Sequence, residues 1–332
     1  MILILTAPED THADHVAGLL EERGLDFVRF DPADFPHAAE ISLTYAPTGA
    51  TRQILRAGGR EVDLSTVTAV WSRRPGTPAA GPEITDPAAR ELIAGEGDAF
   101  VRDLWLSLDC LWLPGPPAVL REANRKAAQL RLAGALGFEL PPTLVTNSPD
   151  DVLEFHRAHG GHIVSKMLGI AFLRTYGNEL VRYTERVSHR DLAHVSAIRH
   201  CPMIFQAYVE KRVELRITVV GRRVLACEIH SQTSHHTRHD WRRYDIAATP
   251  HFVHALPAAI ERRCLALTER LGLSYGAIDM IVTPDGRYVF LEINPNGQYL
   301  WIEQQTGLPI SDAIVDQLAA GTPVRAAVGG VK

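Results

Sequence analysis

Apolar and polar residues follow two different spacings along this chain, and the spacing predicts strands in some segments and helices in others. Short continuous apolar runs predict buried strands at 2–5, 27–30 and 67–71. Between the first two, apolar residues at helical spacing predict a helix over 12–23, which ends at Gly24. A strand–helix–strand order at the start of a chain is typical of a small parallel-sheet domain.

Segments rich in proline and glycine separate the predicted elements into three parts. Alternating residues predict a hairpin at 41–45 and 52–55. A loop over 75–87 precedes a helix over 88–108, and Leu113-Pro-Gly-Pro-Pro117 then breaks the chain. We place the first domain boundary at this break. The sequence thus predicts a mixed α/β (α+β) fold with domains at 1–117, 118–203 and 204–332.

The second and third parts combine strands with a few amphipathic helices. Strands are predicted at 143–146, 162–166, 205–209, 214–220 and 223–230. Helices are predicted at 126–136, 258–271 and 311–318. The glycine-bearing segment 168–179 is predicted to be a loop.

The most informative stretch is a second predicted hairpin near the end of the chain. Apolar strands at 280–282 and 288–293 flank the turn sequence Thr283-Pro-Asp-Gly286. Three oxygen-bearing residues interrupt this apolar pattern: Asp279, Glu292 and Asn294. Glu292 and Asn294 lie two residues apart, so their side chains share one face of the strand. Two carboxylates and an amide suit Mg²⁺, which usually shares its coordination shell with substrate phosphates.

A solvated strand face is the ordinary explanation for acidic residues in a hairpin. Glu292, however, lies within Val289-Phe-Leu-Glu-Ile-Asn-Pro295, a run otherwise suited to burial. A carboxylate in such a run needs a charged partner or a metal ion. The hairpin therefore favours a metal–nucleotide site over a solvated surface.

Composition excludes several classes of protein. The chain has 332 residues, of which 46% are hydrophobic and 22% charged, as in soluble globular proteins of more than one domain. A net charge of −5 offers no electrostatic case for a nucleic-acid partner, and no apolar run is long enough to span a membrane. The first residues show no basic signal-peptide region, and the four cysteines have no paired spacing. We therefore expect a cytoplasmic protein with reduced thiols.

Two lysines and one strand pair ahead of the hairpin are further candidates for nucleotide contacts. Lys126 begins a predicted helix, and Lys166 ends a buried strand before a glycine-bearing loop, where an ammonium group can meet phosphates. Either could also be an ordinary surface lysine. The strand edge at Gln206-Ala-Tyr-Val-Glu210 can hydrogen-bond a purine. Glu214 and Arg216 share one strand face, as do residues of many surface ion pairs.

In this order, the candidates resemble the motifs of the ATP-grasp ligase superfamily over nearly the whole chain. The resemblance implies a pre-ATP-grasp domain followed by two domains that clamp ATP. It implies nucleotide contacts from Lys126, Lys166, Gln206, Ala207, Tyr208, Val209, Glu210 and Glu214. It implies two Mg²⁺ ions bound by Asp279, Glu292 and Asn294, with Arg216 on phosphates or an acyl phosphate. The segment 167–174 is poorer in glycine and serine than the phosphate loops of many members.

Three local patterns are similar to those of the microviridin-type peptide maturases, the graspetide synthetases. They are Trp71-Ser-Arg-Arg-Pro75, Asp240-Trp241-Arg242 and Glu292-Ile-Asn-Pro-Asn-Gly-Gln-Tyr-Leu-Trp-Ile-Glu303. Tryptophan–arginine pairs also arise in cation–π contacts. The resemblance implies a ribosomally made precursor peptide with a leader segment as partner, ester or amide crosslinks as product, and a homodimer. The charged segment 182–199 is a candidate leader site or an ordinary surface helix.

The chemistry implied by this family is activation of a side-chain carboxylate by ATP. Arg216 or Arg242 is expected to hold the acyl phosphate, because a guanidinium matches its oxygens bidentately. The candidates for the general base are Glu210, Asp240 and His230. Histidines at 235, 236 and 239 lack the His-Glu-x-x-His pattern of zinc sites, so a loop near the substrate is favoured there. The alternative functions are an intermolecular carboxylate–amine ligase and a binding module without catalysis.

Overall fold

The structure, a computed structural model, describes residues 1–169, 172–175, 178–181, 184–233 and 249–321. Contacts group the described chain into two units. Of the described residues, unit 1 contains 1–120, 272–275 and 309–321, and unit 2 contains those within 121–271 and 276–308. The predicted limits of three domains at 1–117, 118–203 and 204–332 stay a prediction.

A parallel sheet lies at the centre of unit 1, with the strand order β2–β1–β6–β7. Its strands are β1 (Ile2–Thr6), β2 (Phe27–Phe30), β6 (Ala69–Arg74) and β7 (Leu111–Leu113). Every residue of β1 is buried, as expected for a parallel strand covered on both faces. The continuous apolar runs of the sequence predicted the first three of these strands.

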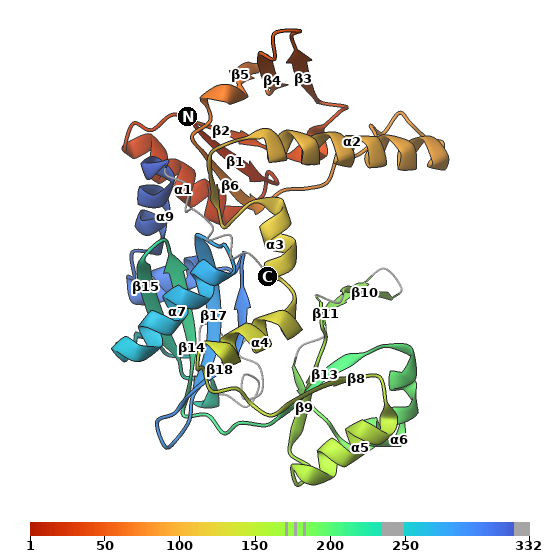
Figure 1. Ribbon diagram of the computed structural model, residues 1–332, viewed down its shortest axis with the longest axis vertical. Coiled ribbons are helices and arrows are strands. Elements are labelled where there is room, and N and C mark those ends of the chain that lie inside the picture. Colours follow the sequence, from red (N-terminus) through yellow and green to blue (C-terminus); the bar gives the residue numbers. More distant parts are fainter. Residues whose placement is uncertain (170–171, 176–177, 182–183, 234–248, 322–332) are drawn as a thin grey trace. The chain divides into compact units, whose positions relative to one another are not determined.

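The helices of unit 1 come from both ends of the chain. They are α1 (Thr11–Glu22), α2 (Pro87–Ser107), the beginning of α3 (Pro117–Ala123) and α9 (Ile310–Ala320). The last of these, α9, lies beside α1 and also contacts β6 (Figure 1). Arg23, which follows α1, pairs with Asp312 and Asp316 on α9. The C-terminal helix therefore completes the unit formed by the first residues of the chain.

A small antiparallel sheet of three strands packs its apolar side chains into the core of unit 1. Its strands are β3 (Ala39–Tyr45), β4 (Thr51–Ala57) and β5 (Arg60–Asp63). The predicted hairpin corresponds to β3 and β4. Strand β5 was missed because Val62 is its one buried residue, so it carries little apolar pattern. Short 3-10 helices occur at Pro32–Asp34 and Leu64–Thr66.

A buried polar cluster lies where β1 and β6 end in unit 1. The guanidinium of Arg73 lies 3.7 Å from the carboxylate of Asp10, which also accepts a hydrogen bond from the Thr6 hydroxyl at 2.8 Å. His12 is buried in the first turn of α1. Its burial, followed by the nearby positive charge of Arg73, lowers the pKa of His12 to about 4. His12 is therefore neutral in the folded protein at neutral pH.

Stability should rise with pH from about 4 to 6.5, because the unfolded chain protonates His12 in this range and the folded chain does not. The free energy of unfolding should gain on the order of 3 kcal/mol in total, and the gain is complete above the pKa of His12 in the unfolded chain. We expect His12→Gln to flatten this rise in urea unfolding measured across the range. Val16→Ala, on the same buried helix face, should lower the free energy of unfolding to the same extent at every pH. An unchanged slope in His12→Gln would contradict this assignment.

Unit 2 contains two larger sheets. The first is antiparallel, with the order β12–β9–β13–β8, and the second has the order β16–β15–β14–β17–β18. The first is built from β8 (Thr143–Thr146), β9 (Ile163–Lys166), β12 (Glu185–Arg186) and β13 (Met203–Ala207). The second is built from β14 (Val213–Val220), β15 (Arg223–Ile229), β16 (His251–Val253), β17 (Tyr275–Val282) and β18 (Tyr288–Asn294).

The described part of unit 2 also contains helices (Figure 1). They are α4 (Lys126–Ala135), α5 (Pro149–Ala158), α6 (His189–Ala193), α7 (Ala258–Arg270) and α8 (Leu300–Thr306). Helix α4 contacts β18, whereas α7 contacts β14 and β15. Short 3-10 helices occur at Val195–His200 and Ser231–Thr233. No helix in the described part of the chain is long and apolar enough to cross a membrane.

One predicted loop contains two strands. The segment 168–179 was expected to be irregular, but β10 (Phe172–Thr175) pairs antiparallel with β11 (Asn178–Val181). Leu173 lies opposite Leu180, and Arg174 lies opposite Glu179. Backbone pairing of two four-residue strands thus outweighs the glycine content that predicted a loop.

Burial also lowers the reactivity of three of the cysteines. Burial raises the pKa of the Cys227 and Cys264 thiols to about 12 and that of Cys110 to about 11. These thiols are therefore protonated at neutral pH and are poor nucleophiles. The fourth cysteine, Cys201, is exposed, and all four are free.

Candidate active site

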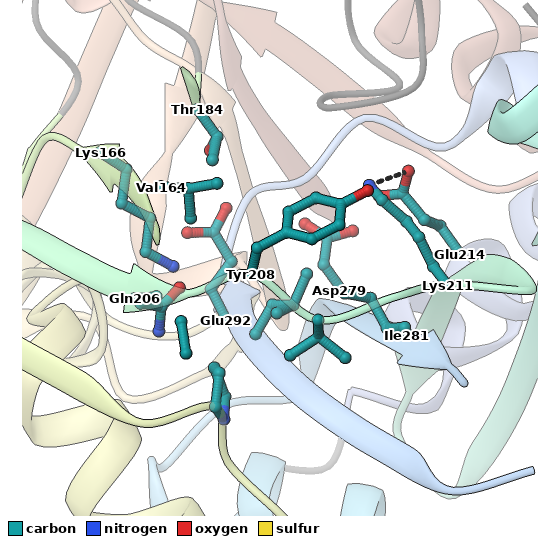
Figure 2. A pocket seen from close by; sticks show the side chains of 14 residues that line it. Val164, Lys166, Thr184, Gln206, Tyr208, Lys211, Glu214, Asp279, Ile281 and Glu292 are labelled. Atoms are coloured by element: carbon teal, nitrogen blue, oxygen red, sulfur yellow. Dashed lines mark hydrogen bonds and ion pairs between the residues drawn. The ribbon is translucent and has the colours of Figure 1, made fainter. Parts of the chain in front are cut away.

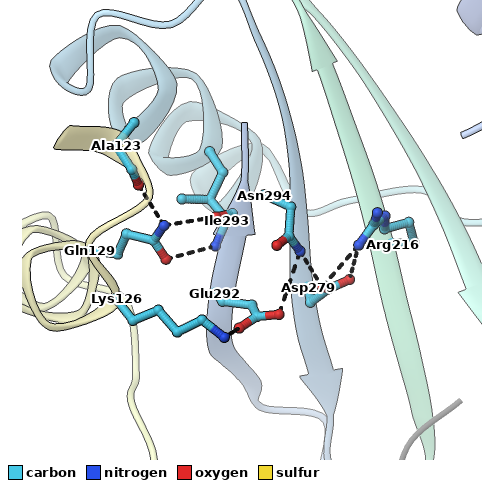
Figure 3. Close-up of polar contacts among 8 residues, drawn as sticks. All are labelled: Ala123, Lys126, Gln129, Arg216, Asp279, Glu292, Ile293 and Asn294. Atoms are coloured by element: carbon cyan, nitrogen blue, oxygen red, sulfur yellow. Dashed lines mark hydrogen bonds and ion pairs between the residues drawn. The ribbon is translucent and has the colours of Figure 1, made fainter. Parts of the chain in front are cut away.

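The predicted oxygen site lies on two neighbouring strands of the five-stranded sheet. Asp279 on β17 is the register partner of Glu292 on β18, and Asn294 follows on the same strand (Figure 3). Asp279 and Glu292 are only 7% and 6% exposed. The Asn294 amide nitrogen donates to Asp279 Oδ2 at 3.0 Å and to Glu292 Oε1 at 3.5 Å. The three side chains therefore converge within unit 2, as the strand spacing predicted.

Two basic side chains approach this oxygen cluster from other elements. Arg216 Nη1, on β14, donates to both carboxylate oxygens of Asp279 at 2.8 and 2.9 Å. Lys126 Nζ, from the first turn of α4, lies 2.9 Å from Glu292 Oε2. Each buried carboxylate thus has a cationic partner, which offsets the cost of burying its charge.

The donor set fits Mg²⁺, because hard oxygen ligands from carboxylates and an amide are the ones that this ion prefers. Asn294 would have to turn its amide over to ligate through oxygen, since its nitrogen faces the carboxylates here. Among the described residues, no three His, Cys, Asp or Glu side chains are grouped to hold a metal ion. At this site the described residues offer two carboxylates and one amide, from Asp279, Glu292 and Asn294.

A pocket opens beside the oxygen cluster in unit 2 (Figure 2). Both sheets of the unit contribute to its walls, together with the segment that connects them. The residues that line it are Pro141, Val164, Lys166, Thr184, Gln206, Ala207, Tyr208, Val209, Lys211, Glu214, Asp279, Ile281, Leu291 and Glu292.

The pocket combines apolar surface with charged side chains. Val164, Ile281 and Leu291 form apolar parts of its lining, and the Ala207–Val209 segment also lines it. The amides of Ala207 and Tyr208 donate to the carbonyls of Pro142 and His162 at 2.9 and 2.8 Å. Lys166 ends β9 with its side chain buried in the pocket wall. An ammonium at this point and the carboxylates opposite provide the charges needed to hold phosphates and a metal ion.

Glu214 belongs to a hydrogen-bond network that the sequence only partly indicated. Its Oε1 accepts from Lys211 Nζ at 2.8 Å and from the Ser231 hydroxyl at 2.6 Å. Lys211 was not among the predicted site residues, although it lies three positions before Glu214. Its side chain is 4% exposed and lines the pocket, which no short sequence pattern indicates.

The structure brings most of the predicted residues together. Eight of them line the pocket: Lys166, Gln206, Ala207, Tyr208, Val209, Glu214, Asp279 and Glu292. Lys126, Arg216 and Asn294 reach the same site through their contacts with the two carboxylates. Glu210 lies within the segment that connects the two sheets, is exposed, and does not line this pocket. Asp240, Arg242 and the histidines 235, 236 and 239 lie outside the described residues.

A glycine allows Arg216 to reach its place. A Cβ atom at Gly297 would overlap the Cβ of Ala277 and lie 2.6 Å from Arg216 Nη2. The same Nη2 donates to the carbonyl of Gln298 at 3.2 Å. The Asn294-Pro-Asn-Gly297 segment therefore packs against the guanidinium that holds Asp279.

We expect Gly297→Ala to displace Arg216 and to lower stability by about 1–3 kcal/mol, the usual cost of inserting a methyl group into a packed site. Thermal unfolding measures the loss of stability, and a fall in the rate of ATP turnover would report the displacement of Arg216. Gly95→Ala on α2 is the matched control, because a Cβ there meets nothing within 4 Å. If both variants behaved alike, close packing at Gly297 would not explain the position of Arg216.

Comparison with known proteins relates this geometry to a group of enzymes. Residues 1–118 match the family model described as the MvdD pre-ATP grasp domain. A RiPP-associated ATP-grasp ligase of Chryseobacterium gregarium, solved with ADP and a leader and core peptide, is 34% identical. The alignment covers 97% of each chain with a TM-score of 0.89.

Two further relatives differ in how much of the chain they match. The macrocyclase MdnC of Microcystis aeruginosa MRC, solved with the precursor peptide MdnA, is 33% identical with a TM-score of 0.84. That alignment covers 96% of this chain and 99% of MdnC. Human N-acetylaspartylglutamate synthase A is 27% identical over 145 residues, which are 41% of this chain. The match spans only 36% of that human protein.

Proposed function

Since this chain belongs to the RiPP-associated ATP-grasp ligases, we propose that it uses ATP to crosslink side chains within a ribosomally made precursor peptide. An Asp or Glu carboxylate of the peptide would be joined to a Ser, Thr or Lys side chain, which gives an ester or an amide. One observation carries this proposal. The buried carboxylates of Asp279 and Glu292, joined by the Asn294 amide and held by Lys126 and Arg216, line one pocket of unit 2.

The reaction requires activation because a carboxylate is a poor electrophile. A carboxylate oxygen of the peptide attacks the γ-phosphorus of ATP, the bond to ADP breaks, and an acyl phosphate forms. A hydroxyl or amine then attacks the acyl carbon, phosphate leaves, and the nucleophile loses a proton to a base. When bound, Mg²⁺ offsets the negative charge of the phosphates. The positive side chains of the pocket stabilise the remainder.

Each predicted residue has a proposed role in this scheme. Lys126 and Lys166 contact the ATP phosphates, and Asp279, Glu292 and Asn294 bind Mg²⁺, with two ions as the proposed number. Arg216 holds the acyl phosphate, assisted by Arg242, and Asp240 is a candidate base. The groups proposed to hold adenosine are Gln206, Ala207, Tyr208, Val209, Glu210 and Glu214. The buried position of most of these side chains around one pocket supports the assignment.

The first sheet of unit 2 offers a separate surface for the leader segment. Between this sheet and α6, apolar residues line a second pocket whose rim carries Arg190 and Asp191. Among the residues that line it are Val152, Val187, Val195 and Phe205. The segment predicted as the leader site contains α6, whose first turn is held by a capping box at Ser188. We propose that a helical leader docks here and that the enzyme is a homodimer.

Mass spectrometry distinguishes the proposed function from its alternatives. A short peptide encoded beside the gene, incubated with the chain and ATP, should lose the mass of one water molecule for each bond formed. Fragmentation should then place each bond between two side chains of the same peptide. A gain in mass by addition of an amino acid would favour an intermolecular ligase. Binding of ATP and peptide without any change in mass would favour a binding module.

A further inference from the structure

A buried glutamine ties helix α4 to the strand that carries two of the oxygen ligands. Gln129 is 2% exposed. Its Nε2 donates to the carbonyl of Ile293 at 2.8 Å, and its Oε1 accepts from the amide nitrogen of Ile293 at 3.2 Å (Figure 3). The same Nε2 donates to the carbonyl of Ala123 at 2.6 Å, near the end of α3. One side chain therefore satisfies both peptide groups of Ile293.

The peptide groups of Ile293 are available because β18 is the last strand of its sheet. A register shift between Asp279 and Met280 inserts one extra residue in β18. On the outer edge of β18, the amide of Phe290 donates to the carbonyl of Glu139 at 2.9 Å, and Gln129 takes the place of a partner strand at Ile293. An edge strand with unpaired peptide groups is otherwise free to shift or fray.

Ile293 stands between Glu292 and Asn294, so its position sets the direction of both side chains. Gln129 also lies one helical turn after Lys126, whose ammonium contacts Glu292. One face of α4 thus supplies the charge partner of a metal ligand and the clamp on the backbone beside it. No short motif signals this role, because the glutamine lies 164 positions before Ile293.

We propose that Gln129 is a positioning residue for the metal site. Its amide holds the Ile293 peptide so that the side chains of Glu292 and Asn294 stay beside Asp279, where the ion that the proposed function requires would bind. The inference rests on that proposed function. Partners that orient metal ligands typically account for about 10–100-fold in metal affinity or activity when they are removed. We expect a loss of that size on removing the Gln129 amide.

The test is the affinity of the protein for Mn²⁺ in the presence of ADP, measured by electron paramagnetic resonance. Gln129→Met keeps the length of the side chain and removes its donor and acceptor groups. Its Mn²⁺ affinity should fall about 10–100-fold, and the KM for Mg²⁺ should rise while the KM for peptide stays near that of the parent protein. Leu267→Ala is the control for lost stability, because it truncates the buried core of α7, which contacts β14 and β15.

Two outcomes overturn the inference. Mn²⁺ affinity equal to that of the parent protein would leave Gln129 a purely structural residue. An equal loss of affinity in Leu267→Ala would attribute the effect to general destabilisation.

If Gln129→Met does not fold, Gln129→Glu is the second variant. It keeps the acceptor for the Ile293 amide and places a carboxylate oxygen against the Ile293 carbonyl. That variant should also bind Mn²⁺ more weakly, and parent-like binding would overturn the inference.

Glu292→Gln in the same assay separates this inference from the proposed function. If Glu292→Gln binds Mn²⁺ as the parent protein does, the metal assignment itself is wrong. If Glu292→Gln loses the ion and Gln129→Met retains it, the metal site stands and only the role of Gln129 is wrong.

Discussion

Glu292→Gln is expected to reduce peptide-dependent ATP turnover by more than about 100-fold. Losing a side chain proposed to bind the metal ion should matter more than losing a residue that orients such a side chain, which costs about 10–100-fold. The substitution removes the charge that we propose attracts Mg²⁺ and also the charged partner of Lys126. It keeps the size of the side chain, so packing around the buried site changes little. Steady-state release of ADP measures the effect.

The matched control for this prediction is Glu269→Gln, an exposed residue on α7. It should turn over ATP at the rate of the parent protein. Turnover that survives in Glu292→Gln would mean that the oxygen cluster does not hold the catalytic metal ion. Loss of turnover in both variants would show only that the protein tolerates no change in charge.

Arg216→Lys is expected to lower kcat about 100- to 1000-fold, the cost of losing one preorganised donor to a charged transition state. The guanidinium binds Asp279 through one nitrogen and the carbonyl of Gln298 through the other. A lysine keeps the positive charge but lacks this planar fork, so it cannot make both contacts and hold an acyl phosphate in the same orientation. Binding of ATP should weaken far less than kcat.

Arg222→Lys tests whether the arginine-to-lysine change has effects of its own. Arg222 is exposed in the turn between β14 and β15, close in sequence to Arg216 but away from the pocket lining. Its kcat should equal that of the parent protein. A fall in kcat of less than about tenfold in Arg216→Lys would contradict the role given to the guanidinium. The geometry of the guanidinium would then lower the activation free energy by less than about 1.4 kcal/mol.

Short sequence patterns predicted those parts of the site whose residues lie close together along the chain. Glu292 and Asn294 share a strand face because side chains alternate, and Thr283-Pro-Asp-Gly286 forms the turn, with Gly286 at a φ of 86°. The ordered motifs also predicted the ATP-grasp fold and the family, and the structural comparisons confirm both. The separate roles of the site residues stay predictions.

Features that depend on distant contacts could not be predicted in this way. Gln129 sits on a helix with little apolar asymmetry, and its partner lies 164 residues later in the chain. The burial of Lys211 in the pocket wall depends on Ser231 and Glu214 lying together, which only the folded sheet decides. The packing of α9 on α1 unites the two ends of the chain, and hydrophobic spacing does not report which surface a helix covers.

The transfer of carboxylate oxygen to phosphate tests the central claim most directly. A precursor peptide whose Asp and Glu carboxylates carry a heavy oxygen isotope would be incubated with the chain and ATP, and the released phosphate would be analysed by mass spectrometry. Activation as an acyl phosphate predicts one labelled oxygen in phosphate for every water lost from the peptide. Unlabelled phosphate released together with crosslinked peptide would contradict this mechanism.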